Sequence, residues 1–203
     1  MAERGETSLW EDARDKLKSL LFHGLNAWLG WDVTLDTDDR RVLDGIILPH
    51  LAAAPEFGKV LFVGSDWYTR RYNRVFADKE YWTIDKDPSR ARYGASRHLT
   101  DVLQNLERHF APGYFDLILC NGVLGWGLDA KDDAEAAFAA CWHTLREGGV
   151  FVLGWNNIPR RRPLSLESST GLARFKPYVF APLKESRYLT RSRNQHTFDF
   201  YVK

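Results

Sequence analysis

From residue 59 onward, short apolar runs alternate with longer segments in which apolar residues recur every three or four positions. The apolar runs are 60–63, 81–84, 115–120 and 150–153, and the segment 97–100 is a weaker third run between the second and the next. They lack polar alternation, which is typical of strands covered on both faces. This rhythm predicts a parallel sheet with helices on both faces, joined by right-handed crossovers.

The intervening segments predict helices from their 3.6-residue period. The last of them is the longest, and either Asp132 or Asp133 is expected to cap its start, with Glu147-Gly148-Gly149 at its end. The three predicted helices are Tyr68–Ala77, Val102–Phe110 and Asp132–Arg146.

The first 57 residues have a different pattern. Leu9–Leu29 and Asp36–Ala54 each carry an apolar stripe at helical spacing, and Pro55 and Gly58 end the second. We therefore expect residues 1–57 to form a helical segment that serves as a lid or cap of the same domain.

The end of the chain breaks the alternation again. Residues 157–187 hold four prolines and no clear helical period. Tyr188–Arg193 and His196–Val202 then flank Asn194-Gln195, which predicts a hairpin with a two-residue loop. The last strand should therefore run antiparallel to its neighbour, within a single α/β domain over residues 58–203.

Composition narrows the class of protein. The chain has 203 residues, with 28 Lys and Arg against 27 Asp and Glu, so no strong field indicates nucleic acid or an anionic membrane as a partner. Cys120 and Cys141 lie in apolar or helical patterns and predict buried free thiols. The charged N-terminus does not resemble a signal peptide, and no apolar run approaches the roughly 18 residues of a membrane span. These features predict a cytoplasmic protein.

The first strand ends in the stretch VLFVGSDWYT, with Gly64 as its single glycine. A dinucleotide turn needs G-x-G-x-x-G so that backbone approaches the pyrophosphate closely. Here Asp66 and either Trp67 or Tyr68 stand at the later glycine positions, and the carboxylate of Asp66 would repel a pyrophosphate. The turn and the antiparallel last strand both argue against a nicotinamide dehydrogenase.

The order of motifs resembles the class I S-adenosylmethionine-dependent methyltransferases. The motifs are VLFVGSDWYT, YWTIDKDP, RHLTD, FDLILCNGV, LREGGVFVLGW and HTFDFYVK, within residues 58–156 and 188–203. The resemblance implies a Rossmann-like, mostly parallel seven-stranded sheet with an antiparallel last strand. It also implies methyl transfer from S-adenosylmethionine to an oxygen, nitrogen or sulfur atom, with S-adenosylhomocysteine as product.

The resemblance implies a cofactor site at the strand ends, made of Gly64, Ser65, Asp66, Trp67, Tyr68, Asp85, Lys86, Asp101, Val102, Asn121, Gly122 and Trp126. Backbone N–H groups after Gly64 would face the ligand carboxylate, and Trp67 or Tyr68 would lie near its cationic or adenosyl part. For Asp66 two interpretations stay open, an acceptor for the ligand ammonium or a helix cap.

Two acids follow the second and third strands. Asp85 comes about 20 residues after Gly64, the spacing of a ribose-binding acid, and the competing interpretation is a surface acid at the turn of Asp87-Pro88. Asp101 resembles the acid that accepts from the adenine amino group, with Val102 against the base. It is equally suited to capping the helix that follows, and both roles are compatible.

The residues that would bind the methyl acceptor are less clearly marked in the sequence. Trp126 lies in the glycine-rich loop 122–129 and is expected to act as a lid or wall. Arg160-Arg161-Arg162 is either a solvated loop or a site for an acidic or phosphorylated substrate. No histidine is assigned as a base, and no metal site is expected.

The family's N/D-P-P-Y/F pattern of nucleic-acid amino methylation is missing at Asn121, so a small-molecule acceptor is favoured over nucleic acid. Homo-oligomer formation stays open. A non-catalytic partner subunit that binds S-adenosylmethionine, or only keeps the fold, is the alternative function.

Overall fold

The chain divides into two units, Met1–Leu35 and Asp36–Lys203. A computed structural model describes the chain from residue 35 to residue 203, which covers the second unit. The predicted helix Leu9–Leu29 lies outside the described residues. Within residues 35–203, no helix has both the length and the apolar character needed to cross a membrane.

A single sheet of eight strands organises the second unit. Its order is β3-β2-β1-β4-β5-β8-β6, and β7 also pairs with β8. Strands β1 to β5 are parallel, whereas β8 is antiparallel to β5, β6 and β7. The strands are β1 Lys59–Val63, β2 Glu80–Asp85, β3 Arg97–Thr100, β4 Phe115–Asn121, β5 Leu145–Asn156, β6 Lys176–Pro177, β7 Arg187–Leu189 and β8 His196–Val202. The predicted α/β class with an antiparallel last strand is confirmed, and the two-residue β6 accounts for the strand beyond seven.

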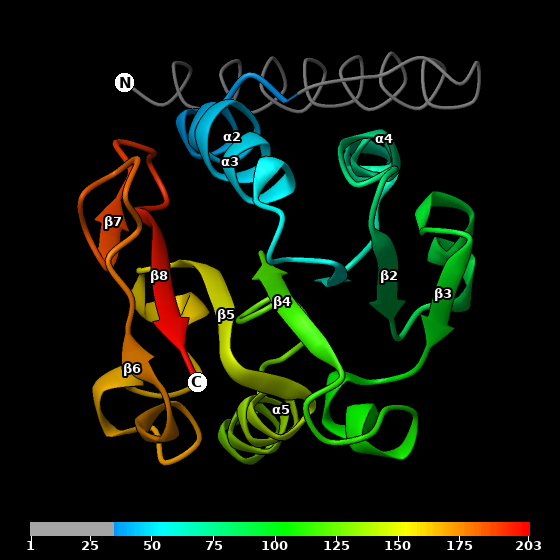
Figure 1. Cartoon of the computed structure of the whole chain (residues 1–203). Helices are drawn as coiled ribbons and strands as arrows, with labels where there is room; N and C mark the ends of the chain where they lie inside the picture. The colour runs from blue at the N-terminus through cyan, green and yellow to red at the C-terminus, as the bar shows by residue number, and fades with distance from the viewer. Residues whose placement is uncertain (1–34) are drawn as a thin grey trace, which may run out of the picture. The chain divides into compact units, whose positions relative to one another are not determined.

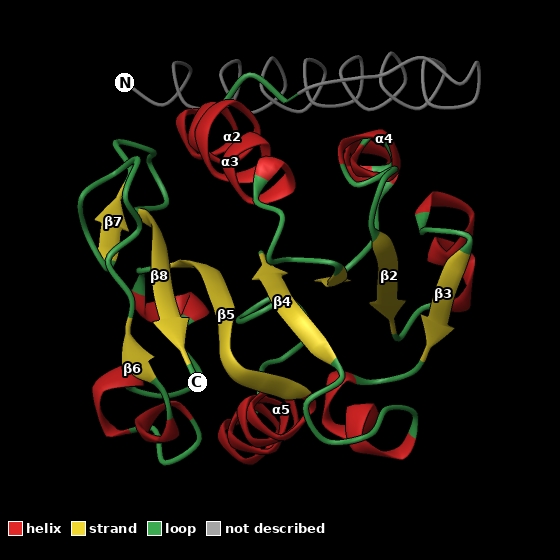
Figure 2. Cartoon of the chain, viewed as in Figure 1, coloured by secondary structure: helices red, strands yellow, loops and turns green. Residues whose placement is uncertain are grey.

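Helices cover both faces of the sheet (Figures 1 and 2). On one face lie α2 (Asp38–Val42), the π turn Leu43–Ile47 that continues it, α3 (Leu48–Ala53) and α4 (Tyr72–Val75); α5 (Lys131–Thr144) lies on the other. Short 3-10 turns complete the structure: Trp67–Thr69, Pro88–Tyr93, Leu103–Arg108, Pro159–Arg161, Leu166–Ser168 and Leu172–Arg174.

The apolar side chains of β1 separate into two cores. Val60 and Phe62 belong to a cluster with α2 and α3, while Leu61 and Val63 belong to a cluster with α5. All four are at most 3% exposed, so the absence of polar alternation did mark a strand covered on both faces. Residues 36–54 therefore supply one layer of the core.

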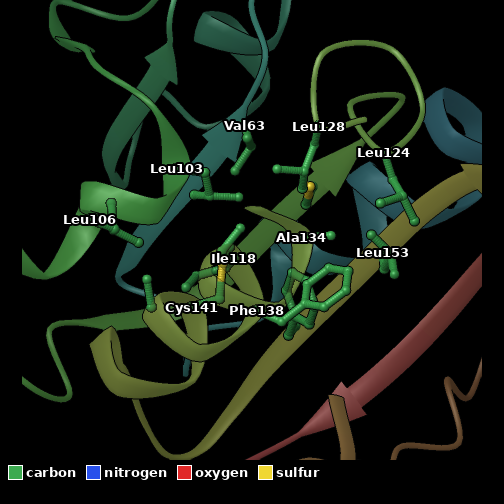
Figure 3. Packing of buried hydrophobic residues seen from close by; sticks show 14 of the residues in the cluster. Val63, Leu103, Leu106, Ile118, Leu124, Leu128, Ala134, Phe138, Cys141 and Leu153 are labelled. Atoms are coloured by element: carbon green, nitrogen blue, oxygen red, sulfur yellow. The ribbon is translucent and has the colours of Figure 1, made fainter. Parts of the chain in front are cut away.

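The cluster beneath α5 also includes side chains from the loop that follows β4. Figure 3 shows Phe138 and Cys141 of α5 next to Ile118 of β4, with Leu124 and Leu128 from the loop after β4 in the same cluster. Cys141 is a buried free thiol, as is Cys120. Both predictions for the cysteines are confirmed, and burial raises the pKa of Cys120 to about 12.

Two predicted helices are shorter than expected. The segment Tyr68–Ala77 holds the 3-10 turn Trp67–Thr69 and the single-turn α4, and Val102–Phe110 holds only the 3-10 turn Leu103–Arg108. Asp66 accepts from the N–H of Trp67, the first residue of its turn, and Asp101 accepts from the N–H of Val102, the residue before its turn. Such local side-chain bonds compete with a longer helix.

The cap predicted for α5 is also wrong. The helix begins at Lys131 after Ala130, whose side chain makes no cap. Asp132 and Asp133 lie inside the first turn, where their negative charge faces the positive end of the helix dipole. The helix ends at Thr144, and β5 starts at once with Leu145, ahead of the glycine pair expected to stop it.

The terminal hairpin has the predicted direction but a longer connection. Residues 190–195 separate β7 from β8, instead of two. His196 fixes this loop, because its carbonyl accepts from Thr190 Oγ1 at 2.9 Å and its N–H donates to Ser192 Oγ at 2.9 Å. Hydroxyl groups that compete for backbone partners therefore end β7 early.

Candidate functional site

The turn after β1 requires glycine at position 64. Gly64 has φ +86°, and a Cβ there would lie 2.9 Å from Val123 Cγ2. Its N–H donates to the Ile84 carbonyl at 2.8 Å, which joins the ends of β1 and β2. The glycine therefore serves a tight turn beside β2, as its position in the sequence predicts.

Asp85 is held at the end of β2 against this turn. Its Oδ2 accepts from the N–H of Ser65 at 2.7 Å, and its Oδ1 accepts from the N–H of Asp87 at 2.9 Å. Each oxygen keeps a further acceptor position, since an ionised carboxylate accepts about four hydrogen bonds. The turn of Pro88–Tyr93 is instead capped by Asp87, whose side chain accepts from Ser89 N–H.

Asp66 is occupied by contacts within the chain. Its Oδ1 accepts from the N–H of Trp67 at 2.7 Å, its own N–H donates to Thr69 Oγ1 at 2.9 Å, and Arg90 forms an ion pair with the carboxylate. The helix-cap interpretation of Asp66 thus describes its contacts. Trp67 meets Tyr68 edge to face, with ring centroids 5.1 Å apart.

Tyr68 connects this turn to α2. The guanidinium carbon of Arg40 lies 4.5 Å from the centroid of the Tyr68 ring, and its Nη1 donates to the Tyr72 hydroxyl at 3.1 Å. Burial raises the pKa of Tyr68, so its phenol stays neutral. Reasoning from the sequence missed Arg40, because an arginine in a helix pattern gives no signal beyond a polar position.

Asp101 follows β3 and lies next to Asp85, whose carbonyl accepts its N–H at 3.2 Å. Its Oδ1 accepts from Val102 N–H at 2.7 Å and from Asn105 Nδ2 at 2.9 Å, and its Oδ2 lies 2.7 Å from His109 Nε2. The hydrogen bond from His109 is the main reason that the pKa of Asp101 falls to about 2. The carboxylate thus holds the 3-10 turn after β3 and keeps spare capacity only at Oδ2.

A buried histidine joins the ends of β4 and β5. His196 is 5% exposed, with Nε2 3.0 Å from Asn121 Oδ1 and Nδ1 2.9 Å from Asn156 Oδ1. Burial lowers its pKa to about 4, so the ring is neutral at pH 7. Since a neutral imidazole has one N–H, it donates to only one of these two amide oxygens. No pattern in the sequence links Asn121 to His196, which is 75 positions away.

The loop 122–129 is tied down by two basic side chains. Lys86 Nζ donates to the Gly127 carbonyl at 2.9 Å, and Arg161 Nη1 donates to the Gly125 carbonyl at 2.7 Å. The guanidinium carbon of Arg161 lies 3.3 Å from the centroid of Trp126, which is still 55% exposed. Arg161 therefore binds the loop 122–129, through the Gly125 carbonyl and the Trp126 ring.

Most of the predicted residues lie along the ends of the neighbouring strands β3, β2, β1 and β4. Gly64, Ser65, Asp85 and Asp101 are linked by hydrogen bonds at the ends of β1, β2 and β3. Gly122 lies at the end of β4 with φ +71°, and a Cβ there would meet no heavy atom within 4 Å. Arg160 and Arg162 are exposed.

A comparison with known proteins matches the part of the chain that holds the candidate site. A family model described as a methyltransferase domain matches residues 63–153. No curated protein matches the chain. The fold is similar to that of the N-methyltransferase NodS from Bradyrhizobium japonicum WM9, with 16% identity, a TM-score of 0.60, and coverage of 83% of this chain and 99% of that chain. NodS has also been solved with S-adenosyl-L-homocysteine.

Two further solved structures share the fold. A TehB-like S-adenosylmethionine-dependent methyltransferase from Corynebacterium glutamicum is 19% identical, with a TM-score of 0.57 and coverage of 97% of this chain and 99% of that chain. The 1,6-didemethyltoxoflavin-N1-methyltransferase from Burkholderia thailandensis, solved with 1,6-didemethyltoxoflavin and S-adenosylhomocysteine, is 17% identical, with a TM-score of 0.53 and coverage of 100% and 91%. The sheet order and the antiparallel β8 are thus those of a methyltransferase-like fold.

Proposed function

Because the chain belongs to the class I S-adenosylmethionine-dependent methyltransferase family, we propose that it transfers a methyl group from S-adenosylmethionine to an oxygen, nitrogen or sulfur atom of a small molecule. The matched model spans the stretch from the end of β1 to within β5, which includes the Gly64 turn and both acids. The transfer is an in-line displacement at the methyl carbon.

One observation supports the cofactor more than any other: Asp85 stands at the end of β2 with both carboxylate oxygens fixed by backbone N–H groups. Each oxygen has room for one more donor, which matches the two neighbouring hydroxyls of a ribose. The half-buried side chain keeps access to a ligand at the strand ends, where open α/β sheets bind their ligands.

A nicotinamide dinucleotide fits this turn poorly. A pyrophosphate needs free backbone N–H groups at close approach, yet those of Ser65, Asp66 and Trp67 already donate to Asp85, Thr69 Oγ1 and the Asp66 carboxylate. S-adenosylmethionine has no phosphate, so the missing glycines do not count against it.

The chain's own part in the reaction is to position and enclose the reactants. Bound S-adenosylmethionine supplies an electrophilic methyl carbon, so covalent help from the protein is not needed. The loop 122–129, held by Lys86 and Arg161, borders the end of β4 and would limit access of water to that edge. His196 stays neutral and bound to two asparagines, which suits a positioning role for Asn121.

The class of methyl acceptor is inferred from the similar proteins and from the overall charge of the chain. NodS is an N-methyltransferase and the Burkholderia protein binds 1,6-didemethyltoxoflavin, a small molecule. The near balance of charges over the chain supports a small-molecule acceptor over nucleic acid. Two buried free thiols support a reducing, cytoplasmic location.

A non-catalytic subunit is favoured by one observation. The ion pair of Asp66 with Arg90 fills part of the turn that would face the amino-acid end of the cofactor. Such a protein would bind S-adenosylmethionine and S-adenosylhomocysteine equally, or neither, and would form no product.

Parallel calorimetry of the full chain with S-adenosylmethionine, S-adenosylhomocysteine and NAD tests the proposal. We expect both adenosyl ligands to bind at one site and NAD to bind far more weakly. Stronger binding of NAD than of S-adenosylhomocysteine would refute the assignment. Methyl transfer from labelled S-adenosylmethionine to a panel of small amines, phenols and thiols then separates an enzyme from a binding subunit.

A further inference from the structure

Trp126 is the only exposed Phe, Trp or Tyr side chain among residues 35–203, with 55% of its surface exposed. A large aromatic ring normally buries its apolar surface or offers it to a partner. The loop around the ring is hydrogen-bonded, because Trp126 N–H donates to the Val123 carbonyl at 2.9 Å and Gly125 N–H donates to the Leu128 carbonyl at 3.0 Å. The ring is therefore held on an ordered turn while it stays exposed.

The loop that carries Trp126 borders the carboxyl ends of the parallel strands. At its start, Val123 lies against Gly64 in the turn after β1. The glycines on either side of Trp126 accept hydrogen bonds from Lys86, which follows β2, and from Arg161, which follows β5. Trp126 thus lies at the edge of the sheet where open α/β folds bind their ligands.

The segment after β5 has positive charges that no described carboxylate neutralises. Arg160, Arg161 and Arg162 form no ion pair within residues 35–203. The guanidinium carbon of Arg161 lies over the Trp126 ring, 3.3 Å from its centroid, and the Arg161 Nε–H is buried without a hydrogen-bond partner in this part of the chain. A stacked guanidinium with donors to spare is well suited to a planar anion.

The flat ring and the unpaired charges together select a class of acceptor. The positive charge of Arg161 on one face of Trp126 disfavours a second cation on the other face. Building on the proposed function, we propose that the methyl acceptor is a planar aromatic acid, whose ring stacks on Trp126 and whose carboxylate binds the guanidinium groups of residues 160–162. An aliphatic acid would use only the charges, and a neutral aromatic molecule would use only the ring.

A second tryptophan with a basic neighbour provides matched controls. Arg174 lies over the Trp142 ring with its guanidinium carbon 5.5 Å from the centroid, and Lys203 Nζ lies 4.1 Å from the same centroid. Lys203 N–H donates to the Gly149 carbonyl in the first half of β5, so this pair lies toward the opposite end of the sheet. Trp142→Leu therefore controls for Trp126→Leu, and Arg174→Gln controls for Arg161→Gln.

Calorimetry of the full chain saturated with S-adenosylhomocysteine tests the proposal with benzoate, 2-naphthoate and quinoline-2-carboxylate. Each acid is compared with its carboxamide, which lacks the charge, and with its saturated-ring analogue, which lacks the flat ring. The parent protein should bind at least one acid about fivefold or more tightly than both analogues, the effect of a charge-assisted hydrogen bond or of one stacked ring.

The variants separate the two contacts. Trp126→Leu should abolish the preference over the saturated analogue, and Arg161→Gln should reduce the preference over the carboxamide. Both should keep the affinity for S-adenosylhomocysteine within about threefold of the parent value. The two control variants should keep both preferences. Thermal unfolding of every variant shows whether it is folded.

Three results would overturn the proposal: no binding of any of the acids, equal binding of an acid and its analogues, or unchanged preferences in a folded Trp126→Leu. The first two need only the parent protein, so they decide the matter even if a variant does not fold. Binding of S-adenosylhomocysteine without binding of any acid would refute this inference alone. Failure of the parent protein to bind S-adenosylmethionine and S-adenosylhomocysteine would instead refute the proposed function.

Discussion

The two ends of the proposed cofactor site are built in different ways. At the adenosine end, Asp85 ends β2 and Asp101 directly follows β3, and backbone N–H groups bind both carboxylates. At the methionine end, the acid nearest to the turn, Asp66, is bound by its own chain and by Arg90. Arg40, which comes from a helix before β1, lies against Tyr68 of this turn.

This difference shows which parts of a site follow from strand order alone. Each carboxylate at the adenosine end stands at the end of its strand and is bound by backbone N–H groups of that turn or of the turn after β1. The methionine end depends on packing between α2 and the turn Trp67–Thr69 through Arg40 and Tyr68. We expect substitutions at the two ends to have separable effects on affinity, stability and pH dependence.

The largest effect should come from the adenosine end. Asp85→Ala removes two charge-assisted hydrogen bonds to ribose hydroxyls, each worth roughly 1.5–3 kcal/mol, so the affinity for S-adenosylhomocysteine should fall about tenfold to a thousandfold. Calorimetry measures this loss. The control is Asp87→Ala, two positions away, which removes an exposed acid that caps only the 3-10 turn. Parental affinity in Asp85→Ala would remove the main support for the cofactor site.

The pH dependence of stability should separate the contribution of His196 from that of the carboxylates at the strand ends. The pKa of His196 is about 4 in the folded protein, against 6.5 as its ordinary value, so the unfolded chain binds more protons between these limits. Stability from this group is complete above pH 6.5 and is lost as the pH falls toward 4, by on the order of 3 kcal/mol. Denaturant unfolding at several pH values measures the slope. His196→Gln should flatten it, while the exposed His50→Gln should keep it; equal slopes in all three proteins would argue against a buried neutral ring.

Asp101 should matter more for folding than for binding. Asp101→Ala removes the acceptor for Val102, Asn105 and His109 and should cost about 1–2 kcal/mol of stability, with little change in affinity for S-adenosylhomocysteine. The pKa of Asp101 is lowered to about 2, so its stabilisation is present above pH 3.8 and disappears as the pH falls through 2. Thermal unfolding and calorimetry on the same sample separate the two effects. A loss of affinity as large as that of Asp85→Ala would make Asp101 primarily a ligand-binding acid.

The smallest effect should come from Asp66. Asp66→Asn keeps an oxygen for the Trp67 N–H and removes the charge, so affinity for S-adenosylmethionine should change by no more than about threefold. A loss of tenfold or more, measured by calorimetry, would assign the ligand ammonium to Asp66. The methionine end would then depend on the turn as much as on α2.

Much of the fold could be predicted from local pattern. The five predicted runs became β1 to β5, and the lack of polar alternation in 60–63 and 115–120 matches strands that are buried on both faces. Gly64 and Asp85 followed from their positions at strand ends. Helix lengths were overestimated at Tyr68–Ala77 and Val102–Phe110, because aspartate side chains close 3-10 turns there. The six-residue connection before His196 was missed, since it depends on hydroxyl contacts that form only in the folded chain.

The remaining parts of the site come from contacts between distant segments. Arg40 meets Tyr68 across 28 positions, and His196 meets Asn121 across 75. No residue type or spacing in the sequence marks such pairs, because each side chain is ordinary in its own helix or strand pattern. The sequence therefore predicted the acids of the adenosine end and left the methionine end incomplete.

A crystal structure of the full chain with S-adenosylhomocysteine would test the central claim most directly. The account predicts that both ribose hydroxyls donate to the Asp85 carboxylate, with each oxygen keeping its bond to Ser65 or Asp87 N–H. A ligand bound away from the end of β2, or a ribose with no contact to Asp85, would contradict it.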